Sequence, residues 1–240
     1  MKHVLITGVS RGIGEAVARR MSADAWEVTG VYRRRHDRAE RLEQDLGGAL
    51  KTVACDLGDR SKMEELVRGL DSRFDGVVLN AGVAYRAAFA QDDVDGVDPL
   101  TTQLELDLLA PLRLLRALLR DHKVEEGGSV VFVSSNLARR GLPGKVAYAA
   151  AKAGLEGACR GLARELGPAG IRVNCVSPGL LATDMTAEVG AAGYESYAKE
   201  VPLGRVGHPP DVAGVVRFLL GDDARYVSGQ VVDVDGGWSA

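Results

Sequence analysis

Thr7-Gly8-Val9-Ser10-Arg11-Gly12-Ile13-Gly14 decides the fold, because it joins a short apolar run to a segment of helical periodicity. The run at residues 3–7 has the length and composition of a buried strand, and a helix is expected over residues 13–23. Glycines at such a junction let the backbone approach a phosphate, and the helix N-terminus supplies free N–H groups. The spacing is not the usual G-x-G-x-x-G, so a plain glycine-rich turn is the alternative. We expect a dinucleotide-binding loop made by Gly8, Ser10, Arg11, Gly12, Ile13 and Gly14.

The same alternation of apolar runs and helical segments continues along the whole chain. Strands are predicted at residues 3–7, 27–32, 50–55, 76–79, 129–134, 172–176 and 230–234. Helices are predicted at residues 13–23, 38–46, 61–70, 103–122, 146–166 and 210–220. Buried strands separated by helices indicate an α/β fold, here one doubly wound Rossmann domain over residues 1–240 with a seven-stranded parallel sheet and helices on both faces. Residues 83–99 and 184–207 show little periodicity, and we expect them to be mobile loops over a ligand, with 184–207 the substrate loop.

Composition excludes several classes of partner. The net charge of −3 over 240 residues gives no sign of a nucleic-acid or membrane partner. Three scattered cysteines, Cys55, Cys159 and Cys175, are too few for a disulfide framework or a zinc site, and no other metal-ligand spacing is present. No apolar run approaches membrane-spanning length, and the first strand begins too early for a signal peptide. A cytoplasmic protein is expected.

The end of the second predicted strand is where such folds select between the two nicotinamide cofactors. An acidic residue there suits a free ribose 2′-hydroxyl, whereas arginine suits a 2′-phosphate. The chain has three arginines directly after Tyr32, and we expect Arg33, with Arg11, to bind the phosphate of NADP(H). A solvated charge run is the alternative. Asp56 and Leu57 end the third strand and are expected at the adenine, although such an aspartate can also be only a helix cap.

Tyr148 and Lys152 lie four residues apart in an alanine-rich segment, which places both side chains on one face of the predicted helix. A free phenol exchanges its proton poorly at neutral pH. A neighbouring ammonium favours the phenolate, so Tyr148 is a candidate general acid–base. The spacing alone is common by chance and needs support from other motifs.

Several motifs together resemble the short-chain dehydrogenase/reductase family over essentially the whole chain. They are the glycine loop, Asn80-Ala81-Gly82, Ser135 thirteen residues before Tyr148, the Tyr148/Lys152 pair, Pro178-Gly179 with Thr183, and Asp235-Gly236-Gly237. The resemblance implies hydride transfer between a nicotinamide and a carbonyl carbon, with Ser135 bonding the carbonyl oxygen, Tyr148 moving the proton and Lys152 bonding the ribose. Ser134 is a possible substitute for Ser135. The resemblance also implies cofactor contacts from Asn80, Ala81, Gly82, Pro178, Gly179, Leu181 and Thr183.

Within the family the sequence is most similar to bacterial 3-oxoacyl-(acyl-carrier-protein) reductases. This implies a ketone on a carrier protein, attracted by Arg139, Arg140 and Lys145 unless these are only a solvated loop. A polyketide intermediate or a small free ketone or alcohol is the alternative substrate. Asp107 stands where the family has a relay asparagine, which invites a third hypothesis, a non-catalytic subunit of a heteromer; we expect activity to be retained. A buried aspartate is unfavourable unless it is paired or protonated, so we expect Asp107 to contact Lys152 or a nearby donor. A homotetramer is expected from the family and from two broadly apolar helices, with a dimer second.

Overall fold

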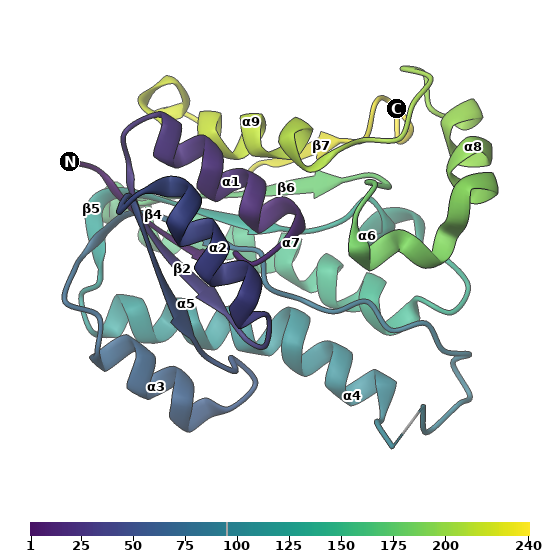
Figure 1. Ribbon diagram of the computed structural model, residues 1–240, viewed down its shortest axis with the longest axis horizontal. Helices are drawn as coiled ribbons and strands as arrows, with labels where there is room; N and C mark the ends of the chain where they lie inside the picture. Colours follow the sequence, from purple (N-terminus) through teal and green to yellow (C-terminus); the bar gives the residue numbers. More distant parts are fainter. Residues whose placement is uncertain (95) are drawn as a thin grey trace.

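A computed structural model describes residues 1–94 and 96–240. Its centre is one sheet of seven parallel strands in the order β3-β2-β1-β4-β5-β6-β7 (Figure 1). Their bounds are β1 His3–Thr7, β2 Glu27–Tyr32, β3 Leu50–Ala54, β4 Phe74–Leu79, β5 Val124–Val133, β6 Arg172–Pro178 and β7 Val231–Val234. The predicted single Rossmann domain is confirmed, and each predicted strand is present with ends shifted by a few residues at most.

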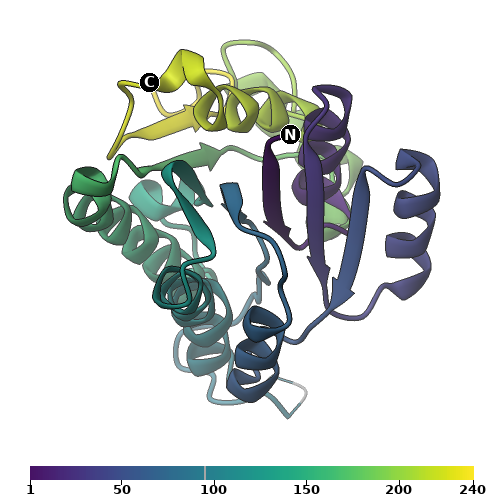
Figure 2. The same cartoon turned by 90° about the vertical axis from the view of Figure 1, so that its left-hand side faces the viewer.

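Helices cover both faces of the sheet, because alternate residues of each strand point to opposite sides (Figure 2). In β1, Val4 and Ile6 belong to one core cluster and Leu5 belongs to the other. The first cluster packs under α1 Gly12–Ala23, α2 His36–Leu46 and α9 Pro209–Leu220. The second packs under α3 Arg60–Arg68, α5 Ala110–Arg120 and α7 Val146–Leu166.

The strand order places a ligand crevice between β1 and β4. The chain proceeds from β1 outward to β3, then returns to the other side of β1 with β4. At such a switch point the loops leave their strands in opposite directions, which opens a crevice at the carboxyl ends. The glycine loop follows β1 there, and Asn80 follows β4.

The predicted helix at residues 103–122 is three segments in the structure. α4 Pro99–Leu104 begins earlier than predicted because the Asp98 carboxylate accepts the Leu100 and Thr101 N–H groups. A π-helical turn, η1 Glu105–Leu109, joins α4 to α5. Such turns recur at functional sites, and this one carries Asp107. Helical periodicity reveals neither a π turn nor its boundaries.

Residues 184–207 contain two helices where the sequence predicted a loop. These are the 3₁₀ helix η3 Asp184–Val189 and α8 Gly190–Glu200. No residue of either is buried, so they lack the apolar periodicity by which helices are recognised. The mobility of this segment stays a prediction. Residues 83–94 and 96–98 contain only an isolated bridge between Val94 and Val97, and the part of that expected loop at residue 95 lies outside the described residues.

Shorter helices complete the described structure: α6 Leu137–Arg140, η2 Gly167–Ala169 and η4 Asp222–Ala224. No helix among the described residues is both long and apolar enough to cross a lipid bilayer. The three cysteines are buried and free.

Candidate active site

A cleft of about 470 Å³ lies at the carboxyl ends of the strands. Every site residue predicted from the sequence lines it except Gly14. The glycine loop and the arginines after β2 form one end, and Ser135, Tyr148 and Lys152 form the other. The structure therefore brings residues that are far apart in the sequence into one cavity. Among residues 1–94 and 96–240, no group of three metal-ligating side chains is arranged to hold a metal ion.

The glycine loop is shaped by close backbone contacts that exclude side chains. Gly8 has φ +74°, a left-handed conformation that favours glycine. A Cβ on Gly14 would lie 2.3 Å from the Gly8 carbonyl oxygen, which explains why Gly14 packs behind the loop and does not line the cleft. Asn80 donates its amide to the Thr7 carbonyl at 2.8 Å, which ties β1 to β4. An exposed helix N-terminus with this open backbone fits a pyrophosphate.

The arginines at the nucleotide end lie where the sequence predicted them. Arg11, Arg33, Arg34 and Arg35 all line the cleft. Arg33 Nη1 is 4.0 Å from the nearer oxygen of Asp56, and that oxygen also accepts the Gly58 N–H at 3.1 Å. Asp56 therefore shapes its own turn while still bordering the cavity. The donors at this end fit a 2′-phosphate, so the cofactor-binding residues expected from the sequence are compatible with NADP(H).

Tyr148 and Lys152 project from the first turns of α7 into the other end of the cleft. The Lys152 ammonium lies 5.5 Å from the Tyr148 ring centroid and donates to the Val133 carbonyl at 3.1 Å. Lys152 is almost completely buried, whereas Tyr148 is only partly buried. A fixed cation thus lies beside a phenol that still reaches the cavity.

Asp107 is the buried partner of Lys152. One of its oxygens, Oδ2, is 3.5 Å from Nζ of Lys152 and has no hydrogen-bond partner, while Oδ1 accepts the Val83 N–H at 2.8 Å. Burial raises the pKa of Asp107, with Lys152 opposing that shift. Burial also works against the ammonium, but the charges of Asp107 and Tyr148 outweigh it and raise the pKa of Lys152. The pair therefore holds the lysine in its charged form.

Gly82 lies against Asp107, because an added Cβ at this position would be 2.9 Å from an Asp107 oxygen. Gly82 therefore also makes room for the aspartate, and a ribose contact remains a prediction. Gln103, which sequence reasoning missed, is buried and holds the same wall by accepting the Tyr85 N–H at 2.9 Å and donating to the Val83 carbonyl at 2.8 Å. The sequence carries no motif that marks this residue.

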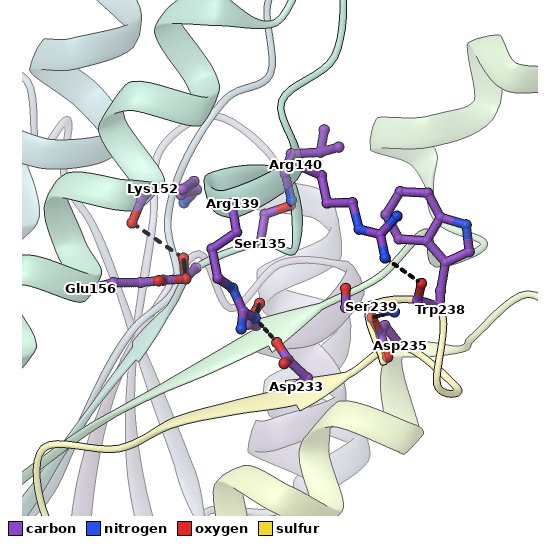
Figure 3. A network of polar contacts seen from close by, with 12 residues as sticks. Ser135, Arg139, Arg140, Lys152, Glu156, Asp233, Asp235, Trp238 and Ser239 are labelled. Carbon is purple, nitrogen blue, oxygen red and sulfur yellow. Dashed lines mark hydrogen bonds and ion pairs between the residues drawn. The ribbon is translucent and has the colours of Figure 1, made fainter.

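The two adjacent serines after β5 have different surroundings. Ser134 donates to Glu156 at 3.1 Å and to the Lys152 carbonyl at 3.2 Å. Both acceptors belong to α7, so the hydroxyl proton of Ser134 is already used within the chain. Ser135 accepts the Leu137 N–H at 3.3 Å and keeps its own proton for another partner. Figure 3 shows Lys152 and Glu156 extending from α7 beside Ser135. The geometry favours Ser135 over Ser134 as the group that contacts a ligand.

The arginines proposed to attract a carrier protein are held by the C-terminal segment (Figure 3). Arg139 pairs with Asp233. Arg140 lies 4.6 Å from the Trp238 ring centroid and donates to the Trp238 carbonyl at 3.0 Å. Both arginines remain exposed although each has a contact within the chain, so attraction of a carrier protein stays a prediction.

The arrangement matches known proteins along its full length. Residues 8–239 match the family model described as enoyl-(acyl-carrier-protein) reductase. The chain is 37% identical over 243 residues to 3-oxoacyl-(acyl-carrier-protein) reductase FabG of Aggregatibacter actinomycetemcomitans, with 98% of each chain covered. It is 35% identical over 240 residues to the cyclic-di-GMP-binding biofilm dispersal mediator protein of Escherichia coli K12, covering 100% of this chain and 98% of the relative.

A short chain dehydrogenase from Burkholderia cenocepacia J2315, solved in complex with NADP, superposes with a TM-score of 0.89 at 33% identity. The match covers 100% of this chain and 98% of that one. This chain belongs to the short-chain dehydrogenase/reductase family. As a member of it, the protein is an oxidoreductase with a nucleotide-binding Rossmann domain. The relatives carry different names, so membership leaves the substrate open.

Proposed function

We propose that the protein reduces a ketone to a secondary alcohol with NADPH as the hydride donor. The supporting observation is a single cleft that has phosphate-binding groups at one end and a tyrosine–lysine pair at the other. Arg11 and Arg33 support the choice of NADPH. NADP or NADPH is also bound in solved relatives that superpose on the whole chain.

Each residue at the catalytic end of the cleft has a separate role in the proposed carbonyl reduction. The nicotinamide, when bound, supplies a hydride to the carbonyl carbon. Ser135 donates its free hydroxyl proton to the carbonyl oxygen and stabilises the charge that develops there. Tyr148 transfers its phenolic proton to that oxygen, so hydride and proton together make the alcohol. Lys152 stabilises the phenolate that remains, and Asp107 keeps the lysine charged and in place.

A 3-oxoacyl thioester is the substrate that this cleft supports best. A second groove continues from Tyr148 between α4, α7 and the segment before α4, and it contains Phe89, Leu100 and Val146. These three apolar side chains are substantially exposed along a groove of only about 30 Å³, so they offer an acyl chain an apolar surface rather than an enclosed channel. Arg139 and Arg140 each have a contact within the chain, so they are not free to bind a carrier protein that presents the acyl group unless those contacts are exchanged. A free thioester or a small ketone, including a polyketide intermediate, is therefore the second candidate.

A substrate panel tests the proposal directly. Oxidation of NADPH would be followed with acetoacetyl-carrier protein, acetoacetyl-coenzyme A, a series of small ketones and crotonyl-coenzyme A. We expect turnover of the 3-oxo compounds and none of the crotonyl thioester. Ser135 and Tyr148 both act on an oxygen bonded to the carbon that accepts the hydride, and a crotonyl thioester has no oxygen on that carbon. Turnover of the crotonyl thioester alone would replace the proposal with enoyl reduction. No turnover of any substrate would favour the non-catalytic subunit instead.

Assembly and location remain proposals. We propose a homotetramer, since Leu109 is exposed and Leu112 and Leu119 are only partly buried on the helical segment around α5. Light scattering coupled to gel filtration distinguishes this from a dimer. A cytoplasmic location also stays a prediction.

A further inference from the structure

The carboxylate of Asp184 lies among arginines at the nucleotide end of the cleft. Asp184 begins η3, the helix that follows the cofactor residue Thr183. Its Oδ2 accepts a hydrogen bond from Arg38 and lies 3.8 Å from Nη1 of Arg11. Arg35 adds its positive charge to the same carboxylate, and together these guanidiniums lower the pKa of Asp184. Two guanidiniums from separate elements therefore contact one intramolecular anion, and Arg35, which is 3.7 Å from Asp37, acts on it only at longer range.

Resting on the proposed use of NADP(H), we propose that Asp184 is a specificity-determining residue that competes with the cofactor's 2′-phosphate for these arginines. Arg11 lines the same cavity as Arg33 and Arg34. A carboxylate held against Arg11 already satisfies part of the charge that a phosphate would use. Binding of a 2′-phosphate must either displace Asp184 or accept repulsion from it, whereas a nucleotide without that phosphate meets no such competition.

The competition is modest because Asp184 and its partners are about half exposed. Ion pairs with that access to water contribute little, and they exchange readily for another anion. Asp184 is also attached to η3, whose residues Met185 and Thr186 border the cavity. Displacement of the carboxylate would therefore release this end of η3 at the moment the phosphate arrives.

The other end of η3 provides a matched control. Glu188 lies 3.7 Å from the Lys145 ammonium, which also donates to the Ala84 carbonyl at 2.8 Å. Glu188 does not line the cofactor cleft. Replacing either acid by its amide loosens η3, but only Asp184→Asn removes charge from the arginines. The two variants thus separate loosening of the helix from competition for the phosphate site.

The test uses calorimetric binding of two nucleotide fragments, adenosine 2′,5′-bisphosphate and adenosine 5′-monophosphate. We expect Asp184→Asn to tighten binding of the bisphosphate about two- to fivefold. Binding of the monophosphate should not change. Glu188→Gln should leave both affinities at the wild-type value. Asp184→Glu, which keeps the charge, should behave like the wild type, and the gain in Asp184→Asn should shrink in high salt.

Two results would overturn the inference. Equal tightening of both nucleotides, or no change for the bisphosphate, would show that Asp184 does not compete for the phosphate. A wild-type protein that binds the bisphosphate no better than the monophosphate would overturn the phosphate-selecting role of the arginines, and with it the NADP(H) assignment. The first result leaves that assignment intact, so the two failures are distinguishable.

Discussion

The catalytic end of the cleft, here called the floor, and its nucleotide end, here called the mouth, contain ion pairs of nearly the same length in different surroundings. At the floor, Lys152 and Asp107 are 3.5 Å apart, and their side chains are 6% and 0% exposed. At the mouth, Arg11 and Asp184 are 3.8 Å apart, and their side chains are 46% and 48% exposed. The two pairs differ mainly in how far water reaches their side chains, and only slightly in length. Removing one member of a buried pair leaves a charge without solvation, whereas water replaces the partner of an exposed one.

This difference gives the two regions different functions. The floor pair is buried inside the structure and holds a cation beside Tyr148, as the proposed mechanism requires. The mouth pairs are exchangeable, and an incoming phosphate can take over their arginines. A cation paired with an aspartate is therefore a fixed contact in one place and a replaceable contact in the other.

The largest effect is expected from Tyr148→Phe, which removes the proposed proton donor from the catalytic end of the cleft. Loss of the transferable proton should lower kcat by about 100- to 10,000-fold, the range typical of a general acid. Steady-state oxidation of NADPH measures the rate. Affinity for adenosine 2′,5′-bisphosphate should not change, since the arginines at the far end are untouched.

Tyr194→Phe is the matched control for that variant. Its hydroxyl bonds Thr186 of η3 at the mouth, at 2.9 Å. Loss of this hydroxyl should change kcat by less than about threefold, because it lies outside the proposed proton path and a typical hydrogen bond contributes only about 1 kcal/mol. Equal losses of rate in the two variants would remove the functional distinction between floor and mouth.

Lys152→Met should produce the largest loss of stability. It leaves the Asp107 carboxylate buried without a counter-charge, which costs about 3–5 kcal/mol. Urea unfolding of the variant and the wild type measures the difference. The double variant Lys152→Met/Asp107→Leu should recover much of the loss, since it buries no unpaired charge. If the double variant is as unstable as the single one, the lysine contributes through packing and the pair does not act as a unit.

Asp107→Asn tests the electrostatic coupling without creating a cavity. The Asp107 carboxylate raises the pKa of Lys152 against the opposing effect of burial. Without it, that pKa falls, so the ammonium is lost at a lower pH than in the wild type. The alkaline limb of the kcat/KM profile should therefore shift to lower pH, while turnover at neutral pH stays within about tenfold, the scale of a single hydrogen bond to a charged group. If the wild type has almost no activity and Asp107→Asn has normal turnover, Asp107 inactivates the native protein.

The sequence predicted what local periodicity and motif spacing determine. The helix at residues 146–166 was predicted with its observed bounds, and it places Tyr148 and Lys152 as the four-residue spacing requires. The partners of these residues could not be predicted, because they depend on packing between distant segments. Arg38 and Asp184 are 146 residues apart in the chain. Asp107 is the exception: a buried aspartate at this position was expected to pair with Lys152 or a nearby donor, and the two groups are 3.5 Å apart. The π turn that carries Asp107 was not predicted.

The smallest effect is expected from Glu188→Gln, which removes an ion pair at the end of η3 that does not line the cleft. Glu188 is 57% exposed and 3.7 Å from Lys145, so the pair should contribute less than about 1 kcal/mol. Lys145 itself is mostly buried, and burial lowers its pKa while Glu188 opposes the shift. Its ammonium keeps the Ala84 carbonyl as a hydrogen-bond partner, so loss of the carboxylate does not leave it unpaired. Urea unfolding should therefore place this variant within about 1 kcal/mol of the wild type. A loss comparable to that of Lys152→Met would mean that the mouth is as rigid as the floor, and that η3 cannot yield to a phosphate.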